Sequence, residues 1–306
     1  MRDVMKDVHA LAPTRGHLQL RSVGLSGIRK PLSIRRPDRV NVLAATIDLA
    51  VDLPADRKGS DLSRNAEILA EIVDRTATQP VESLESACSS IARELLLRHA
   101  YATEATVEAE AEYFLRRGVS PDRLSFEDFR LRAEAHAFRV SDASLSLHRA
   151  IGAEAVGMTA CPCAMETTRA SLEAEFPLLA DPRLRDLPMI THNQRNRTRL
   201  LFLFTGEGEV EVDEIIDAIE AAQSSPTYAI LKRGDEGRVV RDAHRNPKFV
   251  EDVIRDLMAR LPARFPRLPD DVVVRAHTVS EESIHKYNVE ASHEATMGEL
   301  RRAAAA

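Results

Sequence analysis

The amino-acid sequence predicts an α+β fold in which antiparallel sheets carry their helices on one face. Segments with alternating apolar and polar residues flank segments whose apolar residues recur with the helical period of about 3.6 residues. The order strand, strand, helix, helix, strand, strand also occurs twice along the 306 residues. Two such modules leave open sheet edges, and we expect pairing with other subunits into a closed β-barrel to remove them.

The first copy of this order occupies the first half of the chain. Residues 1–20 have no clear period and are expected to form an N-terminal arm. The predicted elements are strands at 22–36 and 40–53 joined by a turn at 36–39, helices at 61–78 and 83–99, and strands at 105–116 and 129–140. Cys88 falls on the apolar face of the second helix and is predicted to be a core residue.

The second copy follows an extended segment that runs toward residue 157. Its predicted elements are a strand at 195–205, a helix at 213–223, a short hairpin within 228–240, a helix at 246–261, and strands at 272–279 and 284–293. Asn246 and Pro247 suit the N-cap and the first position of a helix. The predicted domains are the arm 1–20, a first module 21–160, and a second module 161–306 with an insert at 164–191.

Composition excludes several classes of function. Charged residues make up 29% of the chain and the net charge is −6, which argues against nonspecific nucleic-acid binding because that requires a basic surface. No apolar run reaches the roughly 20 residues that span a bilayer, and the N-terminus lacks the apolar segment of a signal peptide. Three cysteines without a secretory signal fit a reducing compartment, so we expect a cytoplasmic protein with free or metal-bound thiols.

Two of the three cysteines and two histidines are residue types that bind a metal. Cys161 and Cys163 flank a proline in a stretch predicted to be extended, so their side chains should point to opposite faces. A pair of unreactive thiols beside a turn is the alternative. With His192 and His285, one cysteine completes a Cys/His₂ set that leaves an open position for water, as in catalytic metal sites.

Two carboxylates precede His285. If the segment is extended, Glu281 and Glu282 point to opposite faces, so one can enter a pocket while the other stays in solvent. A carboxylate in a pocket can accept two hydrogen bonds from an N–H/NH₂ edge such as guanine presents. An ordinary solvated charge pair is the alternative.

Basic residues could bind phosphate groups. Arg195, Arg197 and Arg199 alternate, so they line one face of a strand. Together with Lys232 and Arg233 they could clamp phosphates. A solvated face of the sheet is the alternative for any single arginine.

Six motifs carry a family resemblance that covers roughly residues 23–300. They are Asp56-Arg-Lys-Gly-Ser-Asp-Leu-Ser-Arg64, Cys161-Pro-Cys163, His192-Asn-Gln-Arg195, Leu231-Lys-Arg-Gly-Asp-Glu236, Asn246-Pro-Lys-Phe-Val-Glu-Asp252 and Glu282-Ser-Ile-His285. With them the chain resembles the type IB, metal-dependent GTP cyclohydrolases, which are built from tandem tunnelling-fold modules. The resemblance implies a homo-oligomer, expected to be a tetramer formed as a dimer of dimers.

The resemblance also implies roles for single residues. Cys161, His192 and His285 match the metal ligands of the family, and Glu282 matches the glutamate that holds the guanine edge. Cys161 and Glu282 are the predicted catalytic residues. The predicted substrate-binding residues are Glu282, Arg195, Arg197, Lys232 and Arg64. The expected cofactor is one divalent metal per subunit, Fe²⁺ in the first place, with Zn²⁺ or Mn²⁺ as alternatives.

The long insert after Cys161 and the segment 224–228 resemble the archaeal, methanopterin-pathway branch, which is described as Fe(II)-dependent. That branch converts GTP to 7,8-dihydroneopterin 2′,3′-cyclic phosphate, formate and diphosphate. Three alternatives stay open: a folate-branch enzyme that makes 7,8-dihydroneopterin triphosphate, a tunnelling-fold enzyme such as the NADPH-dependent nitrile reductase of queuosine synthesis, and a non-catalytic protein that binds a purine or pterin and a metal.

The chain departs from the family pattern at three places. Segment 224–228 lacks the metal-binding glutamate of bacterial members, which leaves a fourth ligand unassigned. Asp61 and Leu62 stand where His and Met are usual, and Tyr287 stands where a histidine is common.

The chemistry that the resemblance implies is the hydrolytic opening of a purine imidazole ring. A bound metal would lower the pKa of water for attack at C8 of GTP, a second hydration would release C8 as formate, and the ribose would then rearrange and reclose. Glu282 would fix the base, and Arg195 with its neighbours would neutralise the phosphates.

Overall fold

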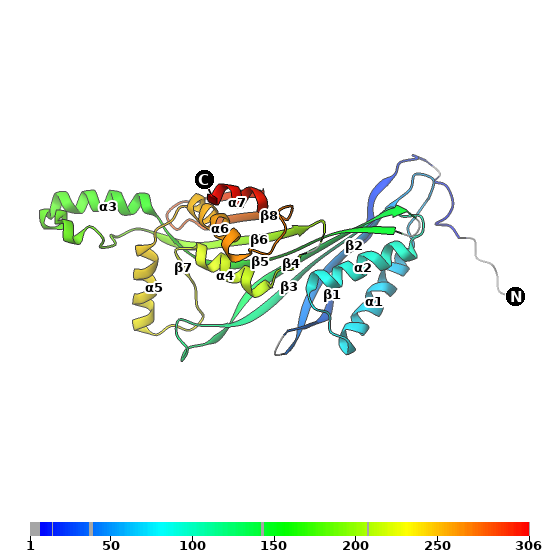
Figure 1. Cartoon of the computed structure of the whole chain (residues 1–306), viewed down its shortest axis with the longest axis horizontal. Coiled ribbons are helices and arrows are strands. Elements are labelled where there is room, and N and C mark those ends of the chain that lie inside the picture. The colour runs from blue at the N-terminus through cyan, green and yellow to red at the C-terminus, as the bar shows by residue number, and fades with distance from the viewer. Residues whose placement is uncertain (1–6, 14, 37–38, 142–143, 207, 306) are drawn as a thin grey trace. The chain divides into compact units, whose positions relative to one another are not determined.

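The computed structural model describes residues 7–13, 15–36, 39–141, 144–206 and 208–305 (Figure 1). The strands are β1 Leu20–Arg35, β2 Val40–Leu53, β3 Glu104–Arg117, β4 Ser125–Ser141, β5 Ser144–Ala160, β6 Asn193–Phe204, β7 Ser225–Pro226, β8 Val273–Ser280 and β9 Val289–Thr296. The helices are α1 Leu62–Thr78, α2 Leu84–Arg98, α3 Pro162–Glu175, α4 Val212–Ala222, α5 Arg233–Arg245, α6 Val250–Arg264 and α7 Met297–Ala305.

The strands follow the hydrogen-bonded order β1-β2-β3-β4-β5-β6-β8-β9, and β7 pairs with β5. The pairs β1–β2, β2–β3, β5–β7 and β8–β9 are antiparallel. The chain divides into two compact units. Unit 1 comprises Met1–Glu112, Leu131–Ile151 and Leu203–Gly206, and unit 2 comprises Tyr113–Arg130, Gly152–Phe202 and Glu207–Ala306.

In unit 1, α1 and α2 lie side by side and pack on the sheet through apolar stripes (Figure 1). α1 buries Ile68, Leu69 and Ile72, and α2 buries Ile91 and Leu95, at the three- and four-residue spacing that places side chains on one face of a helix. In β2, buried and exposed residues alternate, so the strand turns one face to this core. Each fully buried Leu or Ile contributes roughly 1.5–3 kcal/mol.

The described part of the N-terminal arm is held on unit 1 by its backbone. The N–H of Lys58 donates to the carbonyl of Leu11 at 2.7 Å, and the N–H of Gly59 donates to the carbonyl of His9 at 3.3 Å. A Cβ atom at position 59 would lie 2.9 Å from Cδ2 of His9. Glycine is therefore what lets the arm approach so closely.

In unit 2, α6 is the central helix of the core and contacts α4, α7, β8 and β9. Its buried stripe includes Val253, Leu257 and Leu261. Just beyond the helix, Phe265 packs edge-on against Phe202 of β6, with ring centroids 5.0 Å apart. This apolar contact fixes α6 over the strands that carry the candidate site.

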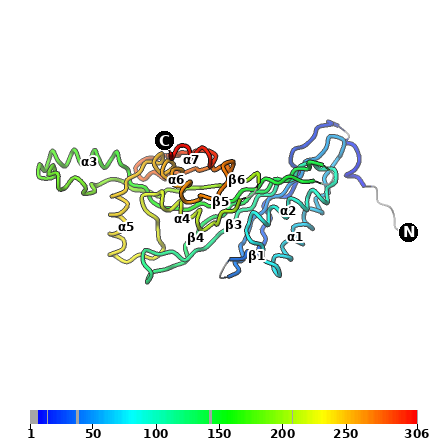
Figure 2. The backbone as a smooth tube through the Cα atoms, in the orientation of Figure 1, coloured from blue at the N-terminus to red at the C-terminus, as the bar shows by residue number. Residues whose placement is uncertain are grey.

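The insert of unit 2 forms a helical extension. α3 is followed by two short 3₁₀ segments, Pro177–Ala180 and Pro182–Leu184, and the chain then folds back along α3 (Figure 2). Arg169 of α3 donates to the carbonyl of Leu187 at 2.6 Å, which ties the returning segment to the helix. Met165 and Met189 are buried at its base.

A helix stands where the sequence predicted a hairpin within 228–240. In α5, Val239 and Ala243 are buried and lie one helical turn apart. At the start of the helix, the carboxylate of Asp235 accepts from the N–H of Lys232 at 3.1 Å. Glycines at 234 and 237 suggest turns because each costs about 1 kcal/mol in a helix. Burial of the apolar stripe outweighs that cost.

α6 begins at Val250 rather than at Asn246, so the predicted N-cap was wrong. Asn246 ends α5 instead, and its Nδ2 donates to the carbonyl of Gln223 at 3.1 Å. At the start of α6, the backbone N–H of Phe249 has no partner within the helix. It donates instead to the carboxylate of Asp252 at 3.0 Å.

The end of the chain also differs from the prediction. β9 covers 289–296 rather than 284–293, and residues 281–288 have no regular structure. α7 was not predicted, because its sequence offers only one turn of apolar residues before a run of alanines. It buries Met297 and Leu300 against unit 2.

The predicted α+β class, with antiparallel strands and two tandem copies of the module, is confirmed. The first copy is β1-β2-α1-α2-β3-β4, and the second is built from β5, β6, α4, α6, β8 and β9 with α3 and α5 added. The module boundary at 160 and the closed barrel stay predictions, and the turn at 36–39 lies partly outside the described residues. Within the described ranges, none of the helices has the length and apolar character needed to cross a membrane.

Glu220 is a nearly buried acid on α4, with 16% of its side chain exposed. Burial raises its pKa from 4.5 to about 7; Arg117, at 3.8 Å, opposes the shift, while Asp217 and Glu127 add to it. The folded chain therefore holds a proton here that the unfolded chain releases at lower pH.

We expect this group to lower the free energy of unfolding as pH rises from 4.5 to about 7, because only the unfolded state gains the free energy of releasing its proton there. The loss should be at most about 3 kcal/mol. Glu220→Gln should abolish it, so that the variant is more stable than the wild type at pH 8. Urea denaturation at pH 5 and pH 8 measures the difference. The exposed Glu214 on the same helix provides the control, and equal pH dependence in Glu220→Gln and the wild type would contradict the assignment.

Candidate functional site

Cys161 caps the N-terminus of α3. Its Sγ accepts from the N–H of Ala164 at 3.5 Å, and Pro162 occupies the first helical turn, where its missing N–H costs nothing. The prediction that Cys161 and Cys163 share an extended segment was wrong, because the helix begins between them. Cys163 is exposed on the helix, whereas Cys161 is half-buried at its start.

His192 lies next to Cys161 because the two ends of the insert are hydrogen-bonded. The N–H of Cys161 donates to the carbonyl of His192 at 3.1 Å. The hydroxyl of Thr191 donates to the carbonyl of Cys161 at 2.7 Å. The structure thus brings two of the three predicted metal ligands onto neighbouring backbone.

Glu282 lies beside the imidazole of His192. Its Oε2 is 3.7 Å from Nδ1 of His192, and only about a tenth of each side chain is exposed. The N–H of Glu281 donates to the carbonyl of Arg195 at 2.9 Å, which fixes the segment after β8 against the start of β6. The carboxylate of Glu281 instead faces the guanidinium of Arg197 at 3.5 Å.

His285, the third predicted ligand, is exposed and lies in the irregular segment 281–288. Its ring stacks on that of Tyr287, with centroids 4.9 Å apart and planes 9° from parallel. Over the described ranges, the ligand atoms of Cys161, His192 and His285 do not come within 4.8 Å of one another as a group. Sulfur and imidazole are ligands that suit Zn²⁺ or Fe²⁺.

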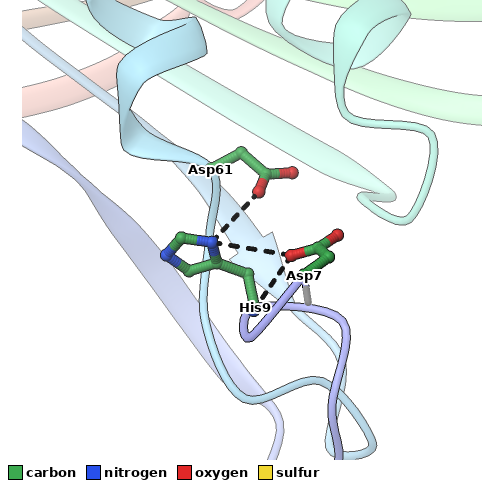
Figure 3. A group of neighbouring side chains, drawn as sticks. All are labelled: Asp7, His9 and Asp61. Carbon is green, nitrogen blue, oxygen red and sulfur yellow. Dashed lines mark hydrogen bonds and ion pairs between the residues drawn. The ribbon is translucent and has the colours of Figure 1, made fainter. Parts of the chain in front are cut away.

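The group of three potential ligands that does lie within 4.8 Å, in the part of the chain described, is Asp7, His9 and Asp61 of unit 1 (Figure 3). Nδ1 of His9 is 3.5 Å from Asp61 and 3.7 Å from Asp7. Arg57 and Arg64 both contact the other oxygen of Asp61, at 2.9 and 3.0 Å. A divalent cation here would meet two guanidinium charges, so this geometry suits a clamp on the N-terminal arm better than a metal.

The three alternating arginines line one face of β6, as predicted, but they differ in their partners. Arg197 and Arg199 both donate to the buried Glu154, Arg197 at 2.7 Å. Burial raises the pKa of Glu154, and the two guanidinium groups outweigh it, so its pKa lies below the ordinary value. Arg195 is exposed and has no ion pair among the described residues. Sequence reasoning missed Glu154, whose only signal was its position among apolar residues of a strand.

The other two predicted substrate-binding residues lie at or in helices. Lys232 is exposed and directly precedes α5. Arg64, in α1 of unit 1, pairs with Asp61 and donates to the carbonyl of Arg98 at 3.1 Å.

A groove of about 540 Å³ lies beside the site in unit 2. One wall is the end of the insert, Pro188 to Thr191, and the other is α5. Its basic side chains are Arg233, Arg241 and His244, and Glu236 adds one carboxylate. Thr191 connects the groove to Cys161 through the hydrogen bond described above, so an anionic group in the groove would lie next to the candidate site.

Comparison with known sequences places the chain in a family. A family model described as type I GTP cyclohydrolase folE2 matches residues 5–291. GTP cyclohydrolase MptA 2 of Methanocella arvoryzae is 39% identical over 305 residues, which cover 97% of this chain and 98% of that protein. GTP cyclohydrolase MptA of Methanosarcina acetivorans is 41% identical over 307 residues, which cover 97% and 96%.

Solved structures support the fold. A hyper-thermostable AgUricase mutant aligns with a TM-score of 0.51 at 8% identity, covering 91% of this chain and 92% of that one. Urate oxidase from Bacillus sp. TB-90 aligns with a TM-score of 0.50 at 11% identity, covering 90% and 100%. These neighbours have the tunnelling fold, which confirms the predicted architecture at the level of the single chain.

The family match and the relatives agree with the resemblance that the motifs at Cys161, His192 and Glu282 suggested. The chain belongs to the type I GTP cyclohydrolase folE2 family.

Proposed function

We propose that this chain is a GTP cyclohydrolase that opens the imidazole ring of GTP and gives 7,8-dihydroneopterin 2′,3′-cyclic phosphate, formate and diphosphate. The observation that carries the proposal is the meeting of Cys161, His192 and Glu282 at the ends of neighbouring elements of unit 2. The nearly full-length similarity to proteins named GTP cyclohydrolase MptA supports the substrate and the archaeal branch.

Cys161 and His192 would hold a divalent metal, with His285 as a third ligand supplied by the irregular segment that follows β8. A bound divalent metal supplies Lewis acidity and lowers the pKa of water at the site. We propose Fe²⁺, with Zn²⁺ or Mn²⁺ as alternatives, because a Cys/His set accepts each of them. A homotetramer built as a dimer of dimers is proposed on the same resemblance.

Glu282 would hold the guanine edge and place C8 of the base near the Cys161–His192 pair. Its side chain is largely shielded from water, so hydrogen bonds from the N–H and NH₂ of guanine would be strong there. Arg195 and Lys232 are exposed, which leaves both available for phosphates. Arg197 already pairs with the carboxylate of Glu154, and Arg64 with that of Asp61. Each guanidinium would contact a phosphate while it keeps its carboxylate partner.

An anaerobic assay of the full-length chain with GTP and Fe²⁺, with products identified by mass, tests the proposal. Formate together with a cyclic monophosphate supports it. A triphosphate product assigns the chain to the folate branch instead, and metal and GTP binding without formate would show a non-catalytic protein. Reduction of a deazapurine nitrile with NADPH would indicate the nitrile reductase class.

Replacing Cys161 should abolish metal binding and catalysis together. Cys161→Ala removes the sulfur ligand, so we expect substoichiometric metal and loss of formate release of at least about 100-fold, in the range that removal of a key catalytic group produces. Metal content by elemental analysis and formate by enzymatic assay measure the two effects.

Cys163→Ala is the matched control, because that thiol is exposed on α3 two residues away. It should retain metal and activity, as should His9→Ala, which removes the imidazole of the Asp7–His9–Asp61 group. Stoichiometric metal in Cys161→Ala, or loss of metal in His9→Ala, would contradict the proposed ligands.

Replacing Glu282 should weaken substrate recognition. Glu282→Gln loses the charge and presents an NH₂ group to the donors of guanine, so kcat/KM should fall by about 100-fold, equivalent to about 3 kcal/mol. Metal content should not change. Glu281→Gln, whose partner is Arg197, should stay within a few-fold of wild type. Equal losses in the two variants would rule out a specific role for Glu282.

A further inference from the structure

A line of hydrogen bonds runs from His192 into the interior of unit 2. Nδ1 of His192 lies 2.8 Å from Oε1 of Gln194, and Nε2 of Gln194 donates to Oγ1 of Thr159 at 3.1 Å. Oγ1 of Thr159 lies 3.2 Å from Oγ of Ser280. The four residues join β6 to its neighbours β5 and β8 at the end of the sheet where Glu282 follows.

The inner half of this line is shielded from water. Thr159 and Ser280 are each 1% exposed, and Gln194 is half-buried. A polar side chain in such surroundings stays hydrogen-bonded, because leaving one of its groups unsatisfied costs about 1–3 kcal/mol. Thr159 accepts from Nε2 of Gln194 and so holds the amide in the orientation in which its oxygen faces His192.

The amide oxygen of Gln194 can only accept a hydrogen bond, so the nitrogen of His192 that faces it must donate. The carboxylate of Glu282 lies 3.7 Å from the same Nδ1, which is too far for a hydrogen bond, so Gln194 is the acceptor that selects the tautomer. Of the two tautomers of the imidazole, this contact selects the one with the proton on Nδ1, which leaves the lone pair of Nε2 available. The structure describes no hydrogen-bond partner for Nε2 of His192 within the ranges given above.

We propose that Gln194 is a positioning residue that holds His192 in the tautomer and orientation in which Nε2 binds the metal, with Thr159 as the anchor of the amide. This inference rests on the proposed function, because it takes His192 as a ligand. A metal-binding imidazole commonly donates its other N–H to a fixed acceptor, and loss of that acceptor weakens metal binding by about 10–100-fold.

His285 shows the contrast. Its ring contacts Tyr287, and no hydrogen bond to either of its ring nitrogens occurs among the described residues. The imidazole of His192 is therefore held by a hydrogen bond before metal arrives, whereas that of His285 is held by its ring contact with Tyr287. The Gln194–Thr159 pair should accordingly matter most for the first capture of the ion.

The tautomer can be measured directly on the metal-free protein by ¹⁵N chemical shifts of labelled histidines. The His192 signals are identified by their disappearance in His192→Gln. In the wild type we expect a protonated Nδ1 and an unprotonated Nε2, and in Gln194→Met a mixture of the two tautomers. A wild-type proton on Nε2, or an unchanged tautomer in Gln194→Met, would overturn the proposal whatever reaction the protein catalyses.

Metal affinity separates positioning from a merely structural role. Gln194→Glu keeps an acceptor for His192 but loses the donor to Thr159, so Zn²⁺ affinity in a chelator competition should stay within about 3-fold of wild type. Gln194→Met keeps the size but not the acceptor and should lose about 10–100-fold. Thr159→Val frees the amide to rotate and should give an intermediate loss. Equal losses in Glu and Met variants that remain folded would overturn the proposal.

The proposed function can fail separately. If the wild type binds Zn²⁺ with the expected tautomer but releases no formate from GTP, the cyclohydrolase assignment is wrong and the role of Gln194 stands. If formate is released but Gln194→Met binds metal as tightly as the wild type, the role of Gln194 is wrong and the cyclohydrolase assignment stands.

Discussion

The hydrogen bond from the N–H of Cys161 to the carbonyl of His192 is the contact on which the candidate site depends. It closes the base of the helical insert and places a sulfur and an imidazole on neighbouring backbone. The hydroxyl of Thr191 reinforces it by donating to the carbonyl of Cys161. Since the backbone supplies most of this link, the approach of the two residues is set by the strands β5 and β6, which are adjacent in the sheet.

The end of β8 and the two faces of β6 supply the remaining polar groups of the site. β8 ends at Ser280, and the next residues return to β6 through the hydrogen bond from Glu281 to Arg195, which leaves Glu282 against His192. Along β6, side chains turned inward join a buried polar network, in which Thr198 contacts Thr278 and Asn196. Side chains turned outward are arginines. One strand thus serves the core on one face and anionic groups on the other.

Sequence reasoning found the strands and most helices because their apolar residues recur regularly over long segments. It failed at α5, where two glycines hid a short apolar stripe, and at Cys161, where the helix start depends on a cap that an extended pattern does not reveal. Cys161, His192 and Glu282 could be singled out by residue type and motif. The place of Glu154 between two arginines, and the partner of each nitrogen of His192, depend on which strands pair, and no single stretch of sequence contains that information.

The closed base of the insert has a consequence for how this family can vary. Because residues 161 and 192 are joined directly, α3 and the turns after it form an excursion whose two ends are already fixed, and changing its length costs little chain entropy. Deletions or additions in that excursion can alter what reaches the groove beside α5 while the cysteine and histidine keep their spacing. Catalysis and substrate access can then diversify on separate parts of the same polypeptide.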